Sequence, residues 1–215
     1  MPDSTPHSHD HAPTPMDDAA WDARYAEADR VWSGAPNGAL VAEVSGMPPG
    51  RVLDVGCGEG ADAVWLAGQG WEVVALDVSK VALDRAAAHA ATAGVEVQWV
   101  HAGLVEADLP DWSFDLVSAQ YAALLSTTDD VAEHALVDAV APGGVLLVVH
   151  HADVDTEHAR SAGFDPGDYV SPPDLVPLLG DGWTVELDGR RERHVSGGAG
   201  AHHTHDVVLR ARRQK

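Results

Sequence analysis

Two carboxylates and a run of glycines are spaced so that they could hold a nucleoside. Asp54 precedes the sequence Gly56-Cys57-Gly58-Glu59-Gly60, and Asp77 follows at a distance of about 20 residues. Glycine has no Cβ, so its backbone can adopt a positive φ and come into contact with a ligand. An acid at the end of the next strand can accept hydrogen bonds from both hydroxyl groups of a ribose. The spacing therefore predicts a nucleoside-binding site.

The residues around this run predict a strand, a turn, a helix and a second strand. Residues 52–55 are almost continuously apolar, which is typical of a strand buried on both faces of a parallel sheet. A helix is expected over 61–67 and the second strand over 71–77. Asp54 lies inside the first strand, where an ionised acid is costly to bury without partners. This cost indicates that Asp54 has a function.

Two kinds of cofactor fit the glycines. Gly56, Gly58 and Ala61 match the dinucleotide pattern G-x-G-x-x-G/A, which would make the protein an NAD(P)-dependent oxidoreductase. Gly56, Gly58 and Gly60 give G-x-G-x-G, which resembles motif I of class I S-adenosylmethionine-dependent methyltransferases. In that family an acid at the position of Asp54 holds the glycine loop and the methionine ammonium, whereas dinucleotide-binding proteins usually have an apolar residue there. Asp54 therefore favours the methyltransferase, and the oxidoreductase stays the alternative.

The resemblance implies an α/β fold with a single Rossmann-like, doubly wound sheet. This class I methyltransferase fold is mostly parallel with a C-terminal antiparallel hairpin. Further strands are expected over 95–100, 114–120 and 145–149, a loop over 153–169, and the hairpin over 183–195 and 204–213. The methyltransferase domain would span 51–215, preceded by lid helices over 17–50. Residues 1–16 are rich in proline and histidine, and we expect them to be disordered because they carry too little apolar surface to fold.

The resemblance also implies S-adenosyl-L-methionine as cofactor, with S-adenosyl-L-homocysteine as product. The segment from Trp21 to Asn37 resembles the lid of the tellurite-resistance and thiopurine methyltransferase-like branch. Gly103 stands where the family commonly has an acid that reaches the adenine amino group, so backbone amides are expected to contact the purine instead. The predicted cofactor contacts are Tyr25, Trp32, Asp54, Gly56, Cys57, Gly58, Gly60, Asp77, Val78, Gly103, Leu104 and Gln120.

Three side chains are candidates for catalysis. Tyr121, His150 and His151 follow or end predicted strands, at the edge where open α/β sheets bind ligands. Methyl transfer is an in-line displacement that depends mainly on positioning, and it needs a base only if the nucleophile arrives protonated. The branch resemblance implies a small-molecule acceptor such as a thiol or chalcogen species. A phenol or amine would need a base, for which either histidine is suited.

Composition argues against several other functions. Acidic residues exceed basic ones by 34 to 13, giving a formal net charge of -21, which repels nucleic acid and anionic membranes. Cys57 is the single cysteine, and the spacing of His194, His202, His203 and His205 matches no standard zinc site, so no metal site is predicted. In a strand, His203 and His205 would share one face. A histidine-rich metal-binding protein is a weaker alternative. We expect a cytoplasmic location, while the sequence does not indicate the oligomeric state.

Overall fold

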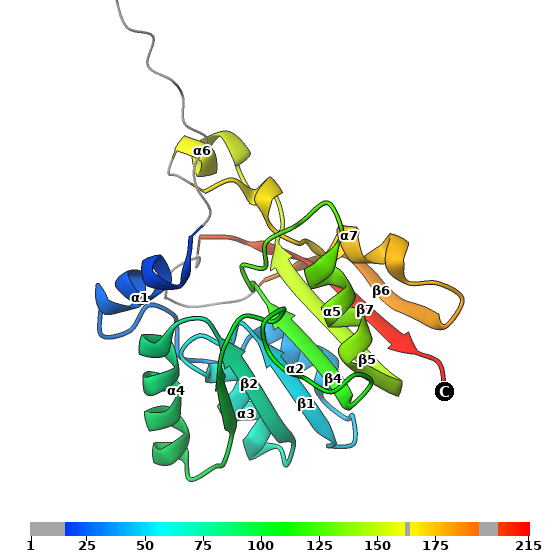
Figure 1. Cartoon of the computed structure of the whole chain (residues 1–215), viewed down its shortest axis with the longest axis horizontal. Coiled ribbons are helices and arrows are strands. Elements are labelled where there is room, and N and C mark those ends of the chain that lie inside the picture. Colours follow the sequence, from blue (N-terminus) through cyan, green and yellow to red (C-terminus); the bar gives the residue numbers. More distant parts are fainter. Residues whose placement is uncertain (1–15, 162–163, 194–201) are drawn as a thin grey trace, which may run out of the picture.

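The computed structural model describes residues 16–161, 164–193 and 202–215, and its strands within these ranges form one sheet of seven (Figure 1). The order across the sheet is β3-β2-β1-β4-β5-β7-β6. The first five strands pair in parallel, whereas β7 is antiparallel to both β5 and β6. The strands are β1 Arg51–Val55, β2 Glu72–Asp77, β3 Gln98–His101, β4 Phe114–Gln120, β5 Val140–His151, β6 Trp183–Glu192 and β7 His205–Arg213. The predicted fold class is confirmed.

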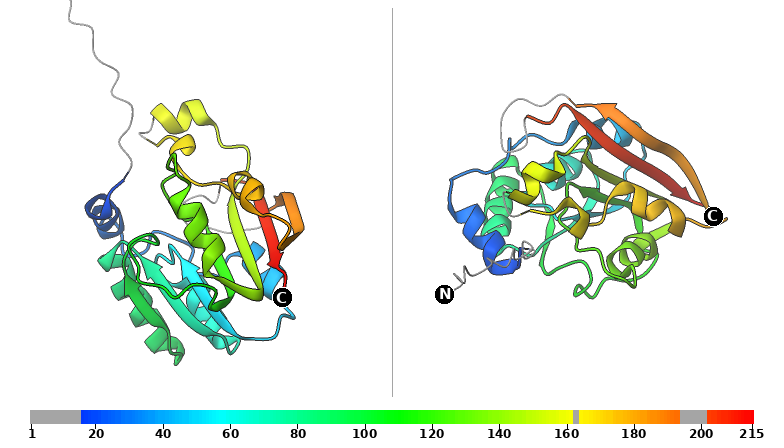
Figure 2. Two further views of the ribbon diagram at one scale, coloured as in Figure 1. Left: turned by 45° about the vertical axis from the view of Figure 1, so that its right-hand side comes forward. Right: turned by 90° about the horizontal axis from the view of Figure 1, so that it is seen from above.

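Helices cover both faces of this sheet (Figure 2). On one face, Leu40 and Leu66 pack with Val52, and on the other, Leu136 packs with Leu53. Successive residues of a strand point to opposite faces, so β1 contributes to both cores. The α-helices are α1 Asp18–Ala26, α2 Gly38–Val44, α3 Ala61–Gly68, α4 Lys80–Ala93, α5 Val131–Ala139, α6 Thr156–Ser161 and α7 Pro172–Leu175, with 3₁₀ turns η1 Pro166–Asp168 and η2 Val176–Leu178.

The parallel arrangement brings the carboxyl ends of β1, β2 and β4 to one edge of the sheet. The glycine run follows β1 directly, Asp77 ends β2, and Gln120 ends β4. The predicted cofactor residues therefore share this edge, because parallel strands place equivalent ends together.

Three expectations about boundaries were wrong. Strand β3 begins at Gln98, because pairing with β2 starts there and not at Val95. Strand β5 begins at Val140 and not at Val145, since Val140 already pairs with Phe114 and the register then shifts. The expected loop over 153–169 contains α6 and η1. Asp155 and Asp165 supply these short helices with side-chain caps, accepting hydrogen bonds from backbone N–H groups at 2.9 and 3.0 Å.

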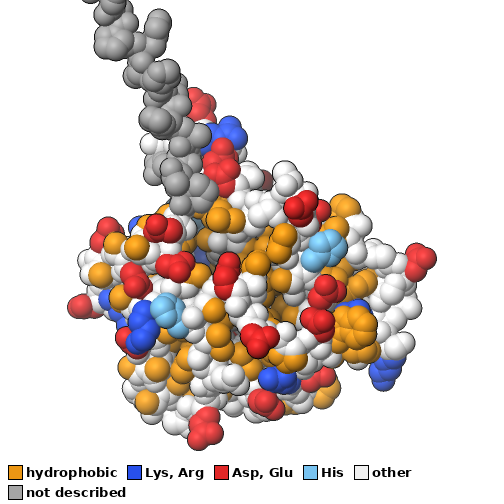
Figure 3. All heavy atoms as spheres, viewed as in Figure 1, with side chains coloured by type: hydrophobic (Ala, Val, Ile, Leu, Met, Phe, Trp, Pro, Cys, Tyr) orange, Lys and Arg blue, Asp and Glu red, His pale blue; other side chains and the backbone are white. Residues whose placement is uncertain are grey.

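Some expectations fall outside the described residues. These are the disorder predicted for the tail, apart from Met16, and the position of His194. Within the described ranges, no helix combines the length and the apolar character that a membrane span requires. Figure 3 shows acidic side chains spread over the visible face of the molecule, with fewer basic ones.

Candidate functional site

Two aromatic residues of the lid lie directly over the glycine loop. Tyr25 of α1 is 4% exposed, and its hydroxyl oxygen accepts a hydrogen bond from the indole N–H of Trp32 at 2.9 Å. Gly58 has φ +53°, and a Cβ atom built on it would lie 2.8 Å from the Tyr25 hydroxyl and 3.4 Å from the Trp32 indole nitrogen. The absence of a side chain at Gly58 is therefore what lets the lid and the loop meet.

Two acids that the sequence analysis did not select hold the lid in place. The Glu59 carboxylate accepts hydrogen bonds from the backbone N–H groups of Val31 and Trp32 at 3.2 and 3.1 Å, and it forms an ion pair with Arg85 at 3.0 Å. Asp62 accepts two hydrogen bonds from Asn37, each 2.7 Å long. Both acids lie in or just after the glycine motif. Their positions were visible in the sequence, but their partners, more than 20 residues away, were not.

Three buried carboxylates surround the loop. Asp54, Asp62 and Asp77 are 2%, 6% and 7% exposed. Burial raises the pKa of all three, and the pKa of Asp54 is raised well above its ordinary value by burial and by the charges of Asp62 and Asp77. The Oδ2 atom of Asp54 has no hydrogen-bond partner among the described residues. A cationic ligand would favour the ionised forms of these acids, so the site is suited to an ammonium or sulfonium group.

Asp77 accepts hydrogen bonds from the backbone at the glycine loop and can accept more from a ligand. Its two carboxylate oxygens accept hydrogen bonds from the backbone N–H groups of Gly58 and Ser79, each at 2.8 Å. The Ser79 hydroxyl in turn donates to Asp22 of the lid helix at 2.6 Å. An ionised carboxylate has about four acceptor positions, so Asp77 keeps capacity for two ribose hydroxyls.

The segment after β3 brings a further acid to the end of the sheet. A Cβ atom built on Gly103 would overlap the carboxylate of Glu106 and would lie 3.7 Å from Cγ1 of Val78. Leu104 is buried beneath this turn. The sequence alone indicates no acid here, because Gly103 stands at the expected position and Glu106 is three residues further along the chain. The chain turns back at 103–107, where the Ala107 N–H donates to the Gly103 carbonyl at 3.0 Å, and this turn returns Glu106 to Gly103.

The end of β4 abuts the glycine loop. A Cβ atom on Gly56, which has φ +67°, would lie 2.9 Å from the side chain of Ala122. Gln120 is 7% exposed and donates to the Ser118 hydroxyl at 3.1 Å, while its Oε1 atom has no partner among the described residues. Tyr121 follows with a left-handed backbone, φ 56°. This junction places Tyr121, a predicted catalytic residue, next to the glycine loop that is predicted to bind the cofactor.

The structure separates the two histidines that end β5. They are consecutive in a paired strand, so their side chains leave opposite faces. His151 stacks between Tyr121 and His203, with ring centroids 4.3 and 4.0 Å apart. Burial and the neighbouring His151 lower the pKa of His150 to about 4.

The histidines near β7 are arranged differently from the expectation. The strand begins at His205, so His202 and His203 precede it, and their rings contact each other at a centroid distance of 4.1 Å. The expectation that His203 and His205 share a strand face was therefore wrong. No cluster of three or more metal-ligating side chains was found in the part of the chain that the structure describes.

Sequence reasoning also missed Asp206, which is 3% exposed at the start of β7. The Tyr121 hydroxyl donates to its Oδ2 atom at 2.9 Å, and Arg193 lies 3.6 Å from its Oδ1 atom. A charged residue inside an apolar strand was the only sequence signal. Its neighbours come from three other segments that the sequence could not bring together.

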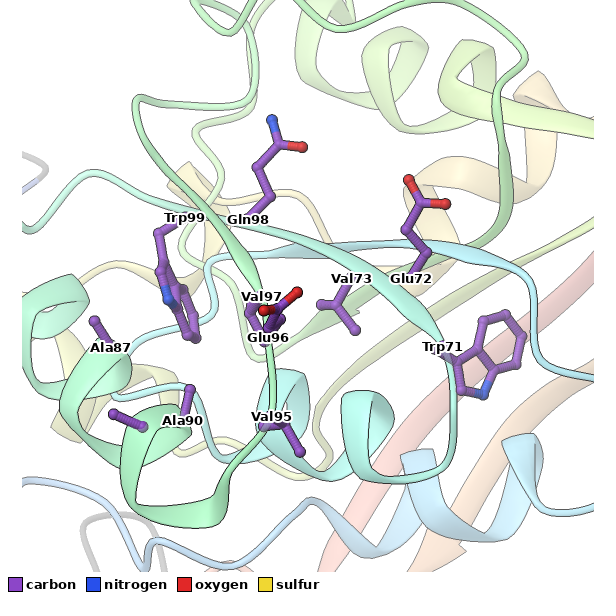
Figure 4. Close-up of a pocket in the computed structure, with 11 residues that line it drawn as sticks. Trp71, Glu72, Val73, Ala87, Ala90, Val95, Glu96, Val97, Gln98 and Trp99 are labelled. Carbon is purple, nitrogen blue, oxygen red and sulfur yellow. The ribbon is translucent and has the colours of Figure 1, made fainter.

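The described residues also form a cavity of about 680 Å³ at the open edge of the sheet (Figure 4). Trp71 and Trp99 flank it, and small side chains of α4 such as Ala87 and Ala90 form its floor. It contains none of the predicted cofactor or catalytic residues, so its chemistry is not that of the glycine loop.

Comparisons with known proteins agree with this geometry. Residues 52–144 match the family model described as a methyltransferase domain. This part of the chain is similar to a methyltransferase domain. The matched region ends at residue 144, inside β5. It therefore covers the glycine loop, β2 and β4 but neither the lid nor the hairpin. An NAD(P)-dependent oxidoreductase and a metal-binding protein are not favoured.

Individual relatives extend the likeness over more of the chain. An uncharacterized methyltransferase of Mycobacterium tuberculosis is 39% identical over 98 residues, which are 46% of this chain and 49% of the relative, so the chain spans about half the length of such curated relatives. A structure entitled "Conversion of a Disulfide Bond into a Thioacetal Group during Echinomycin Biosynthesis" is 28% identical with a TM-score of 0.71, covering 91% of this chain and 92% of the other.

A third comparison concerns the fold alone. The 1,6-didemethyltoxoflavin-N1-methyltransferase of Burkholderia thailandensis, solved with 1,6-didemethyltoxoflavin and S-adenosylhomocysteine, is 20% identical with a TM-score of 0.63. The alignment covers 92% of this chain and 87% of the other, including the C-terminal strands that the family model leaves out. The chain therefore has the Rossmann-like fold that class I methyltransferases share.

The contact between Gly58 and the lid predicts a specific effect of Gly58→Ala. The new methyl group would meet the Tyr25 hydroxyl in a backbone conformation that favours glycine, so we expect a loss of roughly 1–3 kcal/mol in the free energy of unfolding. Urea denaturation followed by tryptophan fluorescence measures this. Gly189→Ala is the matched control, because nothing lies within 4 Å of a Cβ there. An equal effect of both substitutions would contradict the prediction.

Proposed function

We propose that this methyltransferase domain binds S-adenosyl-L-methionine and methylates a small-molecule nucleophile, with a thiol or another soft chalcogen species as the preferred acceptor. The observation that carries the proposal is the pair of buried acids, Asp54 and Asp77, beside a glycine-rich loop. S-adenosyl-L-methionine supplies a methyl group on a positively charged sulfur. The protein's part is to hold this donor and to align the acceptor with it.

The described residues fit this cofactor. The unpartnered oxygens of Asp54 and Gln120 can accept hydrogen bonds from the methionine ammonium, and Asp77 can accept from the ribose hydroxyls. Tyr25 and Trp32 would cover the cofactor from the lid. The remaining contacts that we propose are the loop residues Gly56, Cys57, Gly58 and Gly60, and, around the adenine, Val78, Gly103 and Leu104.

Two further observations support a sulfur acceptor. The structure that concerns conversion of a disulfide bond into a thioacetal shares 28% of its residues with this chain over nearly its whole length. A thiolate is a soft nucleophile and needs little assistance, which suits a site where positioning supplies most of the rate. The lid's resemblance to the tellurite-resistance and thiopurine methyltransferase-like branch is consistent with the same class.

The acidic surface supports a small acceptor and not a nucleic acid. A formal charge of -21 opposes the approach of a phosphate backbone. A cytoplasmic location remains part of the proposal, and so does Tyr121, His150 or His151 as a group that contacts the acceptor. Of the two histidines, His151 is the better base, because a pKa of about 4 leaves His150 a weak one.

The proposal is tested by a methyl-acceptor screen with the full chain. Purified protein and S-adenosyl-L-methionine are incubated with thiols, sulfide, selenium and tellurium species and phenols, and products are identified by mass spectrometry. We expect methylated thiols or chalcogens, and no product with Asp77→Asn, which removes a charge-assisted acceptor of the ribose hydroxyls. Calorimetric binding of NAD(H) without binding of S-adenosyl-L-homocysteine would contradict the proposal.

Cofactor affinity should depend on pH through the buried acids. Because burial raises the pKa of Asp54, this acid is protonated at low pH and must lose the proton to bind a cation well. We expect calorimetry to show that S-adenosyl-L-homocysteine binds more tightly as the pH rises from 5 to 7.5, by up to about tenfold per pH unit for one linked proton.

The same shift has the opposite effect on the protein without ligand. A native-state pKa above the unfolded value means that the native state binds the extra proton, so stability falls as the pH rises through that pKa. Because the ligand binds more tightly at higher pH, the increase in melting temperature that it causes should grow with pH. Asp54→Asn should flatten both dependences, and a pH-independent affinity in the wild-type protein would contradict the assignment.

Glu106 is proposed as the acceptor for the adenine amino group. Its carboxylate occupies the space beside Gly103 and Val78, at the carboxyl ends of β2 and β3. We expect Glu106→Gln to weaken S-adenosyl-L-homocysteine binding by about 3- to 10-fold, because the neutral amide oxygen is a weaker acceptor than the carboxylate. The inosine analogue, which carries an oxygen in place of the amino group, should lose no affinity on this substitution.

Controls separate this contact from a general loss of charge. Asp108→Asn removes an exposed acid of the same segment and should leave both affinities unchanged. In a Glu106→Ala background, Gly103→Asp should restore preference for the adenosine ligand, since the overlapping carboxylate is then absent. Equal weakening of both ligands by Glu106→Gln would show that Glu106 does not contact the amino group.

A further inference from the structure

Asp206 and His151 form a buried acid-imidazole pair beside the predicted transfer site. They are direct cross-strand partners in the antiparallel pairing of β5 and β7, so their side chains lie on the same face. The Oδ1 atom of Asp206 lies 3.5 Å from the Nδ1 atom of His151. Both atoms are buried, and neither has a hydrogen-bond partner within the described ranges. A small adjustment would let the imidazole donate to the carboxylate.

The His151 ring is held in one orientation by its neighbours. Tyr121 stacks on one side at an interplanar angle of 30°, and His203 on the other at 13°. Tyr121 is itself fixed, because its hydroxyl donates to Asp206 and accepts from Arg193 at 3.1 Å. The edge of the ring with Nδ1 therefore faces Asp206, and the edge with Nε2 points away from it. If the single proton of the neutral ring is on Nδ1, Nε2 is a proton acceptor.

This network adjoins the glycine loop. Tyr121 directly precedes Ala122, whose side chain is the neighbour of Gly56. The backbone N–H of Tyr121 also donates to the Val149 carbonyl at 2.8 Å, which joins the end of β4 to the end of β5. A nucleophile bound between the loop and β5 would thus lie within reach of the His151 ring.

The other charged and titratable groups around His151 are less suited to accept a proton. Burial lowers the pKa of both His150 and His203 to about 4, with His151 as a further cause in each case. Burial raises the pKa of Tyr121. Arg193 stays protonated and partly offsets the charge of Asp206. Among these groups, His151 is the side chain best suited to accept a proton, because the carboxylate of Asp206 lies beside it.

We propose that Asp206 is a positioning residue that holds His151 as the proton acceptor for a thiol bound in the acceptor site. The inference rests on the proposed function and extends it, because it assigns the site to thiols that arrive protonated, R–SH, and not only to species that are already anionic.

The reaction balances without a further reactant. The thiol proton passes to Nε2 of His151, and the sulfur lone pair forms the new bond to the methyl carbon. The bond between that carbon and the sulfonium breaks, and its electron pair stays on the departing sulfur. The imidazolium beside Asp206 then returns its proton to solvent. Asp206 favours this charged ring electrostatically.

A first experiment tests the pair without any acceptor. In the full-length protein labelled with ¹⁵N in histidine, the ring resonances of His151 are assigned by comparison with His151→Asn, and the ring tautomer is identified from the ¹⁵N chemical shifts. We expect the wild-type neutral ring to carry its proton on Nδ1. In Asp206→Asn we expect this proton to move toward Nε2, because the carboxylate that favours a proton on Nδ1 is lost. Asp188→Asn, an exposed acid of β6, is the matched control and should change neither property.

A second experiment tests the role in catalysis with two probe thiols. Benzenethiol is largely ionised at neutral pH, whereas 2-mercaptoethanol is largely protonated. Asp206→Asn and His151→Asn should lower kcat for 2-mercaptoethanol by about 10²-fold, the lower end of general-base effects, and have a much smaller effect on benzenethiol. The loss for 2-mercaptoethanol should shrink as the pH rises toward the pKa of the thiol. Calorimetry should show unchanged affinity for S-adenosyl-L-homocysteine.

The outcomes are distinguishable. Equal losses for both thiols, or a His151 tautomer that is the same with and without Asp206, would overturn the inference. If Asp206→Asn does not fold, Tyr121→Phe keeps the acid, removes one of its hydrogen bonds, and should change the balance between the two His151 tautomers. If the wild-type protein binds S-adenosyl-L-homocysteine but methylates neither thiol, the proton-acceptor role toward thiols is refuted. Absence of binding would instead refute the proposed function.

Discussion

The structure depends on burying like charges around a glycine-rich loop. Asp54, Asp62 and Asp77 converge on the glycine run from β1, α3 and β2, where water cannot stabilise their charges. Hydrogen bonds from backbone N–H groups and from Asn37 offset part of this cost, and raised pKa values show that a cost remains. A site of this kind is poised for a cation. A positively charged ligand would lower this electrostatic cost, because it would stabilise the ionised carboxylates.

The lid is part of the same arrangement, because it is attached to the loop through carboxylates. Asp22, Glu59 and Asp62 connect the N-terminal segment to the loop, α3 and α4. Tyr25 and Trp32 come close to the loop only because Gly58 lacks a side chain. Lid position and loop conformation are thus coupled, since a change in either alters the hydrogen bonds of the other.

The parallel and the antiparallel parts of the sheet contribute different residues to the site. The parallel half carries the glycine loop and Asp77, and it is the part that matches a methyltransferase domain. The antiparallel hairpin adds Asp206 to the end of β5 and completes a polar network with Tyr121 and His151. The class I fold serves many acceptors. The hairpin side is therefore where the specificity of this chain is expected to reside.

The sequence alone determined the local features that follow from periodicity and backbone freedom. These are the succession of strands along the chain and the glycine run between two acids. Only the tertiary structure decided which distant side chains meet. It joined Asp206 to His151 and Glu59 to residues 31 and 32 of the lid. The physical reason is that apolar patterns and glycines act over a few residues, whereas a buried charge is defined by neighbours that strand pairing brings from elsewhere in the chain.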